Sequence, residues 1–249
     1  MRKANRTIVV LPDIHAPLED KKALNCALKV IKEVGPDAVI QIGDIGEWES
    51  VSKWKWKKQR RPPLEYQLPA VEKDIDAVRK VMRKITSSFN GELIVVKGNH
   101  DAWNDSFIEE NPYLGDKYWF DSVFEYECSK IVPCGEFHKE GDLYLYHGHH
   151  YQGLLHTRSH LLSMGENVMY GHWHDVQQYT LTRLGGTISA WSIGCLKDMS
   201  TYANKWLGGQ QVNWKHAVAI VEFYGSKFFV RIVEIIDGKC SLDGKLLEG

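Results

Sequence analysis

The sequence lacks both a disulfide pattern and a thiolate metal motif. Its 5 cysteines are odd in number, widely scattered and include no C-x-x-C pair. Such a set argues against a disulfide framework and a zinc-thiolate site, and it favours reduced thiols. No apolar run approaches the roughly 18 residues of a membrane span, and the N-terminal apolar stretch is too short for a signal peptide. We therefore expect a cytoplasmic protein without a membrane partner.

The sequence also lacks a strong charge of either sign. A formal net charge of −1 excludes a polycation that coats nucleic acid or an anionic membrane by bulk attraction, so any basic site must be local. Internal repeats, low-complexity tracts and Pro/Ser-rich linkers are missing as well. With 249 residues, of which 43% are hydrophobic, we expect a single domain over residues 1–249. Nothing indicates an obligate protein partner.

What is present is an alternation of strands and helices typical of an α/β protein. Short apolar runs that read as buried strands occupy residues 8–11, 38–42, 93–96, 143–146 and 168–170. Helical spacing of apolar residues covers 20–34 and 71–85, so the first two runs form a β-α-β unit. Further strands are predicted at 179–184, 187–193, 217–223 and 228–235. Residues 101–142 are the hardest to place.

Each of the five apolar runs is followed by residues of metal-ligating type. In chain order these are Asp13-Ile14-His15, Gly43-Asp44, Gly98-Asn99-His100-Asp101, His147-Gly148-His149 and Gly171-His172-Trp173-His174. One such block is weak evidence, but five in one chain are not readily supplied by chance. Carboxylate, amide and imidazole ligands suit Mn²⁺, Fe²⁺, Zn²⁺ or Ni²⁺. Seven ligands are too many for one ion, so we expect two divalent metal ions. Mn²⁺ is the first candidate, and Fe²⁺, Zn²⁺, Ni²⁺ or Mg²⁺ are alternatives.

The ordered blocks D-x-H, G-D, G-N-H-D, H and G-H-x-H resemble the signature of the calcineurin-like metallophosphoesterase superfamily, in particular its small phage or bacterial nuclease- and phosphodiesterase-like members. The resemblance implies a four-layer αββα sandwich, with two mixed β-sheets flanked by helices. It implies that one metal is held by Asp13, His15, Asp44 and His174. The other would be held by Asp44, Asn99, His147 and His172. Asp44 would then bridge both ions.

The resemblance also implies a reaction. Two ions about 3.5–4 Å apart polarise a phosphoryl oxygen and lower the pKa of a shared water, so a metal-bridging hydroxide is the expected nucleophile. His100 is placed to stabilise developing charge or to protonate the leaving group. Protein serine/threonine phosphatases read G-D-x-x-D-R-G, whereas this chain lacks that arginine, which argues against that branch. Glu47 and Asp101 are alternative candidates for orienting the His100 imidazole.

Substrate contacts are less well defined by the sequence. Residues 53–61, KWKWKKQRR, are either a basic groove in which tryptophans stack bases or a solvated loop whose tryptophans pack on the body. Lys53, Lys55 and Arg60 are the candidate contacts there, and His149 is another. His156 and His160 are expected on an ordinary helix face. Core packing is the expected role of the aromatic residues Trp191, Tyr202, Trp206 and Trp214.

We therefore expect a metal-dependent phosphoester hydrolase, with a phosphodiesterase acting on a nucleotide or nucleic acid as the leading hypothesis. A phosphomonoesterase or a nucleoside-polyphosphate hydrolase would use the same metals, because the metal core sets the reaction and the rim sets the substrate. A non-catalytic metal-binding scaffold is the alternative from another class. The intact His100 argues against it.

Overall fold

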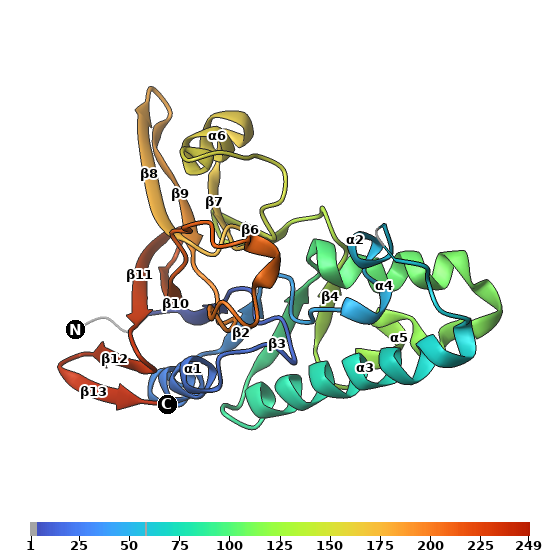
Figure 1. The fold of residues 1–249 in the computed structure, drawn as a ribbon. Helices are drawn as coiled ribbons and strands as arrows, with labels where there is room; N and C mark the ends of the chain where they lie inside the picture. The colour runs from blue at the N-terminus through green and yellow to red at the C-terminus, as the bar shows by residue number, and fades with distance from the viewer. Residues whose placement is uncertain (1–3, 58) are drawn as a thin grey trace.

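The computed structural model describes residues 4–57 and 59–249 and places most strands in two sheets (Figure 1). The first sheet has the order β11-β10-β1-β2-β3-β4 and the second the order β5-β6-β7-β9-β8. The first comprises β1 (Arg6–Leu11), β2 (Ala38–Gln41), β3 (Glu92–Val96), β4 (Lys130–Val132), β10 (His216–Tyr224) and β11 (Lys227–Ile235). The second comprises β5 (His138–Glu140), β6 (Leu143–Tyr146), β7 (Asn167–Tyr170), β8 (Val176–Arg183) and β9 (Gly186–Ile193). A separate hairpin is formed by β12 (Lys239–Leu242) and β13 (Lys245–Glu248).

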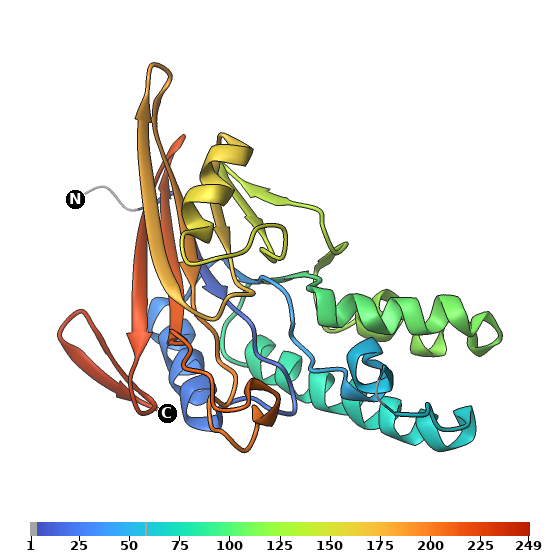
Figure 2. The same ribbon diagram turned by 45° about the horizontal axis from the view of Figure 1, so that its top comes forward.

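The described residues form α-helices and short 3-10 helices. The α-helices are α1 (Lys21–Val34), α2 (Lys53–Trp56), α3 (Leu64–Thr86), α4 (Asn99–Glu110), α5 (Phe120–Phe124) and α6 (His156–Met164). The short 3-10 helices are η1 (Glu49–Val51), η2 (Pro112–Tyr118) and η3 (Lys205–Leu207). In Figure 2, α1 and α3 lie on one side of the strands and α6 on the other.

Both sheets are mixed. In the first, β1 to β4 run parallel, while β10 pairs antiparallel with β1 and β11. In the second, β6, β7 and β9 run parallel between the antiparallel edge strands β5 and β8. The predicted β-α-β unit is confirmed as β1-α1-β2. The five ligand-bearing runs are divided, since three belong to the first sheet and two to the second.

The two sheets pack face to face, with α1 and α3 on the outer side of the first sheet and α6 on the outer side of the second. Ile8 and Ile40 from the first sheet meet Leu145 and Met169 from the second in the buried layer between them. The alternate residues of β1 point the other way, toward a core that includes α1 and α3. A third cluster joins α6 to the outer face of the second sheet. The four-layer αββα sandwich predicted from the resemblance is confirmed.

The local sequence explains α1 well and α3 only in part. Asp20 accepts the backbone N–H of Ala23 as the N-cap of α1, and Gly35 ends the helix in the left-handed region. Helix α3 begins at Leu64, seven residues before the predicted start, and contains Pro69. Most side chains of its first turns are exposed, so no apolar periodicity marks them. Among the described residues, no helix is long and apolar enough to cross a membrane.

Candidate metal centre

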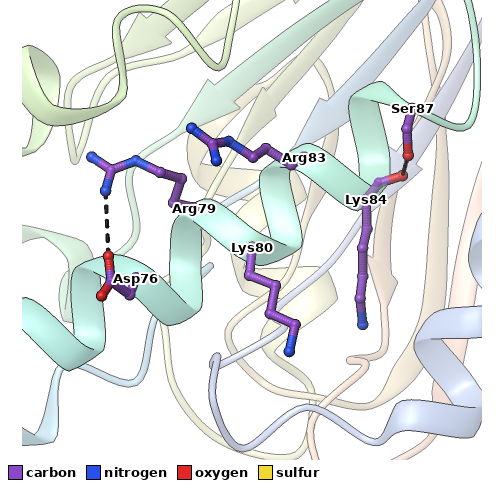
Figure 3. Close-up of a pocket in the computed structure, with 6 residues that line it drawn as sticks. All are labelled: Asp76, Arg79, Lys80, Arg83, Lys84 and Ser87. Atoms are coloured by element: carbon purple, nitrogen blue, oxygen red, sulfur yellow. Dashed lines mark hydrogen bonds and ion pairs between the residues drawn. The ribbon is translucent and has the colours of Figure 1, made fainter.

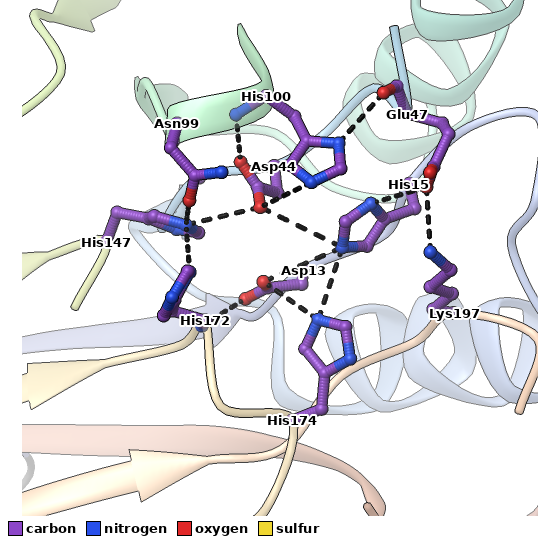
Figure 4. Close-up of polar contacts among 12 residues, drawn as sticks. Asp13, His15, Asp44, Glu47, Asn99, His100, His147, His172, His174 and Lys197 are labelled. Atoms are coloured by element: carbon purple, nitrogen blue, oxygen red, sulfur yellow. Dashed lines mark hydrogen bonds and ion pairs between the residues drawn. The ribbon is translucent and has the colours of Figure 1, made fainter. Parts of the chain in front are cut away.

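Two buried aspartates stand at the ends of neighbouring strands, each with one oxygen held by the backbone. Asp13 follows β1, and its Oδ1 accepts the backbone N–H of His172 at 2.9 Å. Asp44 follows β2, and its Oδ1 accepts the backbone N–H of His100 at 2.8 Å. In both residues the other oxygen, Oδ2, faces the surrounding histidine rings (Figure 4). The backbone therefore fixes which carboxylate oxygens remain available.

This close approach requires glycine at two positions. A Cβ at Gly98 would lie 2.1 Å from Asp44 Oδ1, and one at Gly171 would lie 2.0 Å from Asp13 Oδ1. Real Cβ atoms do not come that near to an oxygen. The glycines that open the G-N-H and G-H-x-H blocks are thus explained by the backbone's contact with the carboxylates.

One group of donors gathers around Asp13. Its Oδ2 lies 3.1 Å from His174 Nε2 and 3.8 Å from His15 Nε2. The two imidazole nitrogens are 3.2 Å apart, and His15 Nε2 is also 3.9 Å from Asp44 Oδ2. Four of the predicted ligands therefore meet at one point.

A second group gathers around the ring of His147. Its Nε2 lies 3.2 Å from Asp44 Oδ2, 2.9 Å from Asn99 Oδ1 and 3.1 Å from His172 Nδ1. Its Nδ1 is 3.1 Å from the carbonyl oxygen of Ile42, which turns Nε2 inward. Because Asp44 Oδ2 reaches both groups, the structure brings all seven predicted ligands together around one shared carboxylate.

The chemistry of these residues fits divalent cations. Carboxylate oxygens and imidazole nitrogens from each group lie within 4.8 Å of one another. Carboxylates, an amide oxygen and imidazoles, with no sulfur among them, suit Mn²⁺, Fe²⁺, Zn²⁺ or Ni²⁺. Carboxylate oxygens and imidazole nitrogens that face one another are stabilised when a positive charge lies among them.

The backbone at the centre is strained. Left-handed φ angles of 56°, 49°, 66° and 60° occur at His15, Asp44, His172 and His174 respectively. Each non-glycine residue held there costs on the order of 1–3 kcal/mol, and such residues cluster where a site demands a particular geometry. Four of the seven ligand candidates share this conformation, which separates the cluster from an ordinary buried polar network.

The pKa values show how the donor cluster balances its buried charges. Although burial lowers the pKa of His15 and His147, nearby carboxylates raise both values to about 9. Burial alone would raise the pKa of Asp13 and Asp44, but the surrounding histidines hold both well below the ordinary range. Burial and the charge of His147 lower the pKa of His172 to about 3. Protons on two histidines therefore compete with any cation for the same carboxylates.

His100 sits at the N-terminal end of α4 beside the donors. Its Nδ1 contacts the main-chain oxygen of Glu47 at 2.8 Å, and its Nε2 lies 3.9 Å from Asp44 Oδ2. The ring of Trp103 packs on the imidazole with 3.9 Å between ring centroids. Burial lowers the pKa of His100. The second nitrogen therefore faces the shared carboxylate while the first is anchored.

Neither acidic candidate orients His100 through its side chain. The Glu47 carboxylate instead contacts His15 Nδ1 at 2.8 Å, and only its main-chain oxygen meets His100. Asp101 accepts the Trp48 indole N–H at 2.8 Å and the Gly98 N–H at 2.9 Å, so it organises the start of α4. Burial and the charge of Asp44 raise the pKa of Asp101 to about 6.

Lys197 is a residue of the site that sequence reasoning missed. Its Nζ donates to Glu47 Oε2 at 2.8 Å, and the lysine is almost completely buried. The segment around it runs beside the end of β1, since Leu196 N donates to Asp13 O at 2.7 Å. A single lysine after a strand carries no signal in the sequence. Its role follows only from the contact made across 150 residues of chain.

The predicted substrate contacts are scattered. Lys53 and Lys55 are paired with glutamates at 3.9 and 2.8 Å, and Arg60 is exposed. Lys58, in the same basic segment, lies outside the described residues. His149 packs against the donor cluster, where burial and neighbouring histidine charge lower its pKa to about 4. Of the four candidates, His149 contacts the cluster directly.

Other aromatic residues and histidines differ from the sequence expectation. His156 and His160 are buried, because α6 turns this face toward the second sheet, where His156 contacts Tyr170 and Asp175 at 2.8 and 3.1 Å. Trp191 is core, as expected. Two other members of that aromatic set are mostly exposed: Tyr202 and Trp206.

The αββα fold and its cluster of oxygen and nitrogen donors define a protein of the metallophosphoesterase type. A family model described as calcineurin-like phosphoesterase matches residues 6–186, which include every predicted ligand. The chain belongs to the calcineurin-like phosphoesterase family.

Relatives with similar sequences include two phage proteins. The Gene 54 protein of Mycobacterium phage L5 is 24% identical over 257 residues, covering 98% of this chain and 99% of the relative. The Gene 54 protein of Mycobacterium phage D29 is 22% identical over 263 residues, covering 98% of this chain and 99% of the relative.

Solved structures with a similar fold include Vacuolar Protein Sorting 29 from Cryptosporidium parvum, with a TM-score of 0.53 and 10% identity over 99% of each chain. A structure described as a novel archaeal phosphodiesterase has a TM-score of 0.45 and 16% identity. It covers 91% of this chain and 99% of its own.

Proposed function

We propose that this protein is a metal-dependent phosphodiesterase that acts on a nucleotide or nucleic acid. The observation that carries the proposal is the position of Asp44 Oδ2, which lies 3.2 Å from His147 Nε2 in one donor group and 3.9 Å from His15 Nε2 in the other. A carboxylate shared in this way is what a dinuclear centre requires. Membership of the calcineurin-like phosphoesterase family supports the reaction class.

The ligand candidates divide between the two groups. We propose Asp13, His15, Asp44 and His174 for one ion, and Asp44, Asn99, His147 and His172 for the other. Two divalent ions there would polarise a phosphoryl oxygen and lower the pKa of a shared water. Glu47 and Lys197 hold the His15 ring by a chain of two 2.8 Å contacts, which orients its Nε2 toward the carboxylates.

In this proposal the cationic form of His100 donates its Nε2 proton to the leaving group, and the lowered pKa makes that cation a stronger acid. With Nδ1 donating to the main-chain oxygen of Glu47, Nε2 is the nitrogen that gains and releases a proton. It lies on the side of the shared carboxylate, where a phosphoester oxygen would depart. Stacking of Trp103 on the ring restricts its rotation and shields it from water.

Besides the basic segment 53–61, a basic surface on α3 lies away from the metal centre. A shallow hollow on α3 is lined by six residues (Figure 3): Asp76, Arg79, Lys80, Arg83, Lys84 and Ser87. Arg79 and Arg83 are already paired with Glu127 at 3.1 and 3.3 Å. These residues belong to the C-terminal half of α3, which leads to the beginning of β3. The metal donors follow the C-terminal ends of the strands, at the opposite edge of the sheet. The hollow is therefore not part of the proposed substrate site.

The proposal is tested with metal-stripped protein reloaded with Mn²⁺, using bis-p-nitrophenyl phosphate as the diester and p-nitrophenyl phosphate as the monoester. We expect turnover of the diester, loss of detectable activity in Asp44→Ala, and a loss of about 10²–10⁴-fold in His100→Ala. Asp142→Ala, at an exposed turn, is the matched control and should behave as the parent protein.

Other outcomes point to the alternatives. Turnover of the monoester alone would favour a phosphomonoesterase, and release of phosphate from nucleoside triphosphates alone would favour a polyphosphate hydrolase. If no ester is hydrolysed with any of the five candidate ions while Mn²⁺ still binds, the protein is a metal-binding scaffold and the proposal is wrong.

A further inference from the structure

A loop of exposed aromatic residues borders the metal centre. The loop spans residues 198–214 between β9 and β10, and we call it the aromatic loop. It is held beside the donors at both ends. Lys197, immediately before it, donates to Glu47, and Lys215, immediately after it, donates its backbone N–H to His174 O at 2.8 Å. The two ends of the aromatic loop therefore lie beside residues of the donor cluster.

Internal hydrogen bonds organise the aromatic loop. The buried Asn204 donates from Nδ2 to the main-chain oxygens of Asp198 and Ser200 at 2.7 and 2.9 Å. Ser200 N in turn donates to Asp198 Oδ1 at 2.8 Å. The short helix η3 follows and carries Trp206. The loop therefore has a defined shape from which its aromatic rings project.

The rings lead outward from a metal ligand. Trp214 packs against His174 with ring centroids 4.6 Å apart, and Trp206 lies 6.2 Å from Trp214. Trp206 is 70% exposed and Tyr202 is 79% exposed. Lys205 Nζ lies 4.5 Å from the centroid of the Tyr202 ring. A tryptophan exposed to this degree on an ordered loop gains nothing from core packing, so its flat face is available to a ligand.

We infer that Trp206 and Trp214 form a stacking platform for a nucleobase of the diester whose phosphate lies at the metal donors. An aromatic face binds every base, and each stacked base contributes substantially to affinity. The exposed Lys205 adds positive charge, which complements the phosphates that accompany a base. The inference rests on the proposed function and narrows its substrate to phosphodiesters that carry a nucleobase.

Trp54 on α2 is the competing aromatic residue, because it is 66% exposed and lies in the basic segment. Its ring is already covered by Lys57 Nζ at 3.8 Å from the centroid. The lysines on either side of it are paired with glutamates. The aromatic loop has the stronger connection to the site, since Trp214 touches a ligand candidate directly.

The test compares two diesters that share a leaving group, thymidine 5′-(p-nitrophenyl phosphate) and methyl p-nitrophenyl phosphate, on the Mn²⁺-loaded protein. We expect the parent protein to prefer the thymidine ester, and Trp206→Ala to reduce the ratio of the two kcat/KM values by about tenfold or more. Trp206→Phe should restore most of the ratio because it keeps an aromatic face. Phe229→Ala is the control, since Phe229 is 64% exposed and pairs with Glu222 near the opposite end of β1.

The inference is overturned if the parent protein shows no preference, if Trp206→Ala keeps the ratio, or if the ratio falls only in Trp54→Ala. A parent protein that hydrolyses neither diester contradicts the proposed function and not the platform. In that case the platform is tested by a binding experiment with 2-aminopurine riboside 5′-monophosphate, whose fluorescence is quenched when the base stacks on an aromatic ring. Quenching that is lost in Trp206→Ala supports the platform, whereas equal quenching by both proteins rules it out.

Discussion

At the residue scale, the geometry of the centre depends on positions where only glycine fits. Gly98 has an ordinary backbone conformation, but a Cβ there would lie 2.1 Å from Asp44 Oδ1 and 2.3 Å from Asp44 N. The shared carboxylate must move if a side chain is added. Since Asp44 Oδ2 serves both donor groups, a shift of one residue disturbs both.

Gly98→Ala should therefore weaken Mn²⁺ binding by about tenfold or more and reduce phosphodiester hydrolysis in parallel. A metal titration followed by isothermal calorimetry measures the first effect, and initial rates measure the second. Gly185→Ala is the matched control, because a Cβ there meets nothing within 4 Å. Unchanged metal affinity in Gly98→Ala would show that the carboxylate position is not critical.

The ligand candidates could be predicted at this scale because their types and order are visible in the sequence. Glu47 was also a candidate, but its carboxylate contacts His15 and not His100, a choice that depends on side-chain direction at a turn. Trp206 is visible in the sequence, but only the structure shows that it is exposed and lies beside Trp214, the ring that packs against His174.

At the element scale, α1 illustrates a helix whose ends are specified locally. The Asp20 side chain accepts the Ala23 N–H at 2.8 Å, which satisfies a backbone donor that has no partner within the helix. Asp20→Ala should lower the free energy of unfolding by about 1 kcal/mol. Urea unfolding followed by circular dichroism measures this loss in the free energy of unfolding. Asp20→Asn should retain most of the stability, and equal losses in both variants would contradict a capping role.

The same scale shows where sequence patterns fail. The start and end of α1 follow from a cap, an apolar stripe and Gly35, so the helix was predicted closely. The segment 101–142 holds most of α4, together with η2, α5 and strands of three residues. Elements this short do not complete enough turns or alternations for a period to appear. Their placement comes from packing, as with Phe120 and Phe124 in the outer core.

At the scale of the whole molecule, Arg6 joins the two sheets. From β1 it donates to Glu140 on β5 through Nε at 3.1 Å, and to Glu92 on β3 through a terminal nitrogen at 3.1 Å. Burial raises the pKa of Glu140, but hydrogen bonds from His138 and Arg6 outweigh it, so the pKa lies below its ordinary value of 4.5. The ionised Glu140 carboxylate therefore stabilises the folded protein fully above pH 4.5, the ordinary pKa. This contribution is lost as the pH falls through the lower pKa that Glu140 has in the folded protein.

Glu140→Gln should accordingly destabilise the protein by about 1 kcal/mol at pH 7, and the difference from the parent should shrink as pH falls below 4.5. Thermal unfolding of both proteins across pH 3 to 7 measures this stability difference. Glu92→Gln removes the more exposed partner of Arg6 and should have a smaller effect. A pH-independent difference would mean that the Glu140 charge is not involved.

The layered architecture could be predicted only through the resemblance. Apolar runs identified β1, β2 and β3, but the pairing of β1 with β10 joins residues more than 200 positions apart, which no local pattern specifies. Because the layer between the sheets draws side chains from both, we propose that residues 1–249 form a single domain.

The anchoring of the aromatic loop also bears on how such a protein diversifies. Since main-chain hydrogen bonds beside the donors fix both ends, we expect the interior of the loop to tolerate changes in length and composition without displacing the ligand candidates. Substitutions within residues 198–213 are then expected to change what is recognised, whereas Trp214 contacts the ligand candidate His174 directly. We expect this stretch to be the most permissive part of the rim for engineering a new specificity.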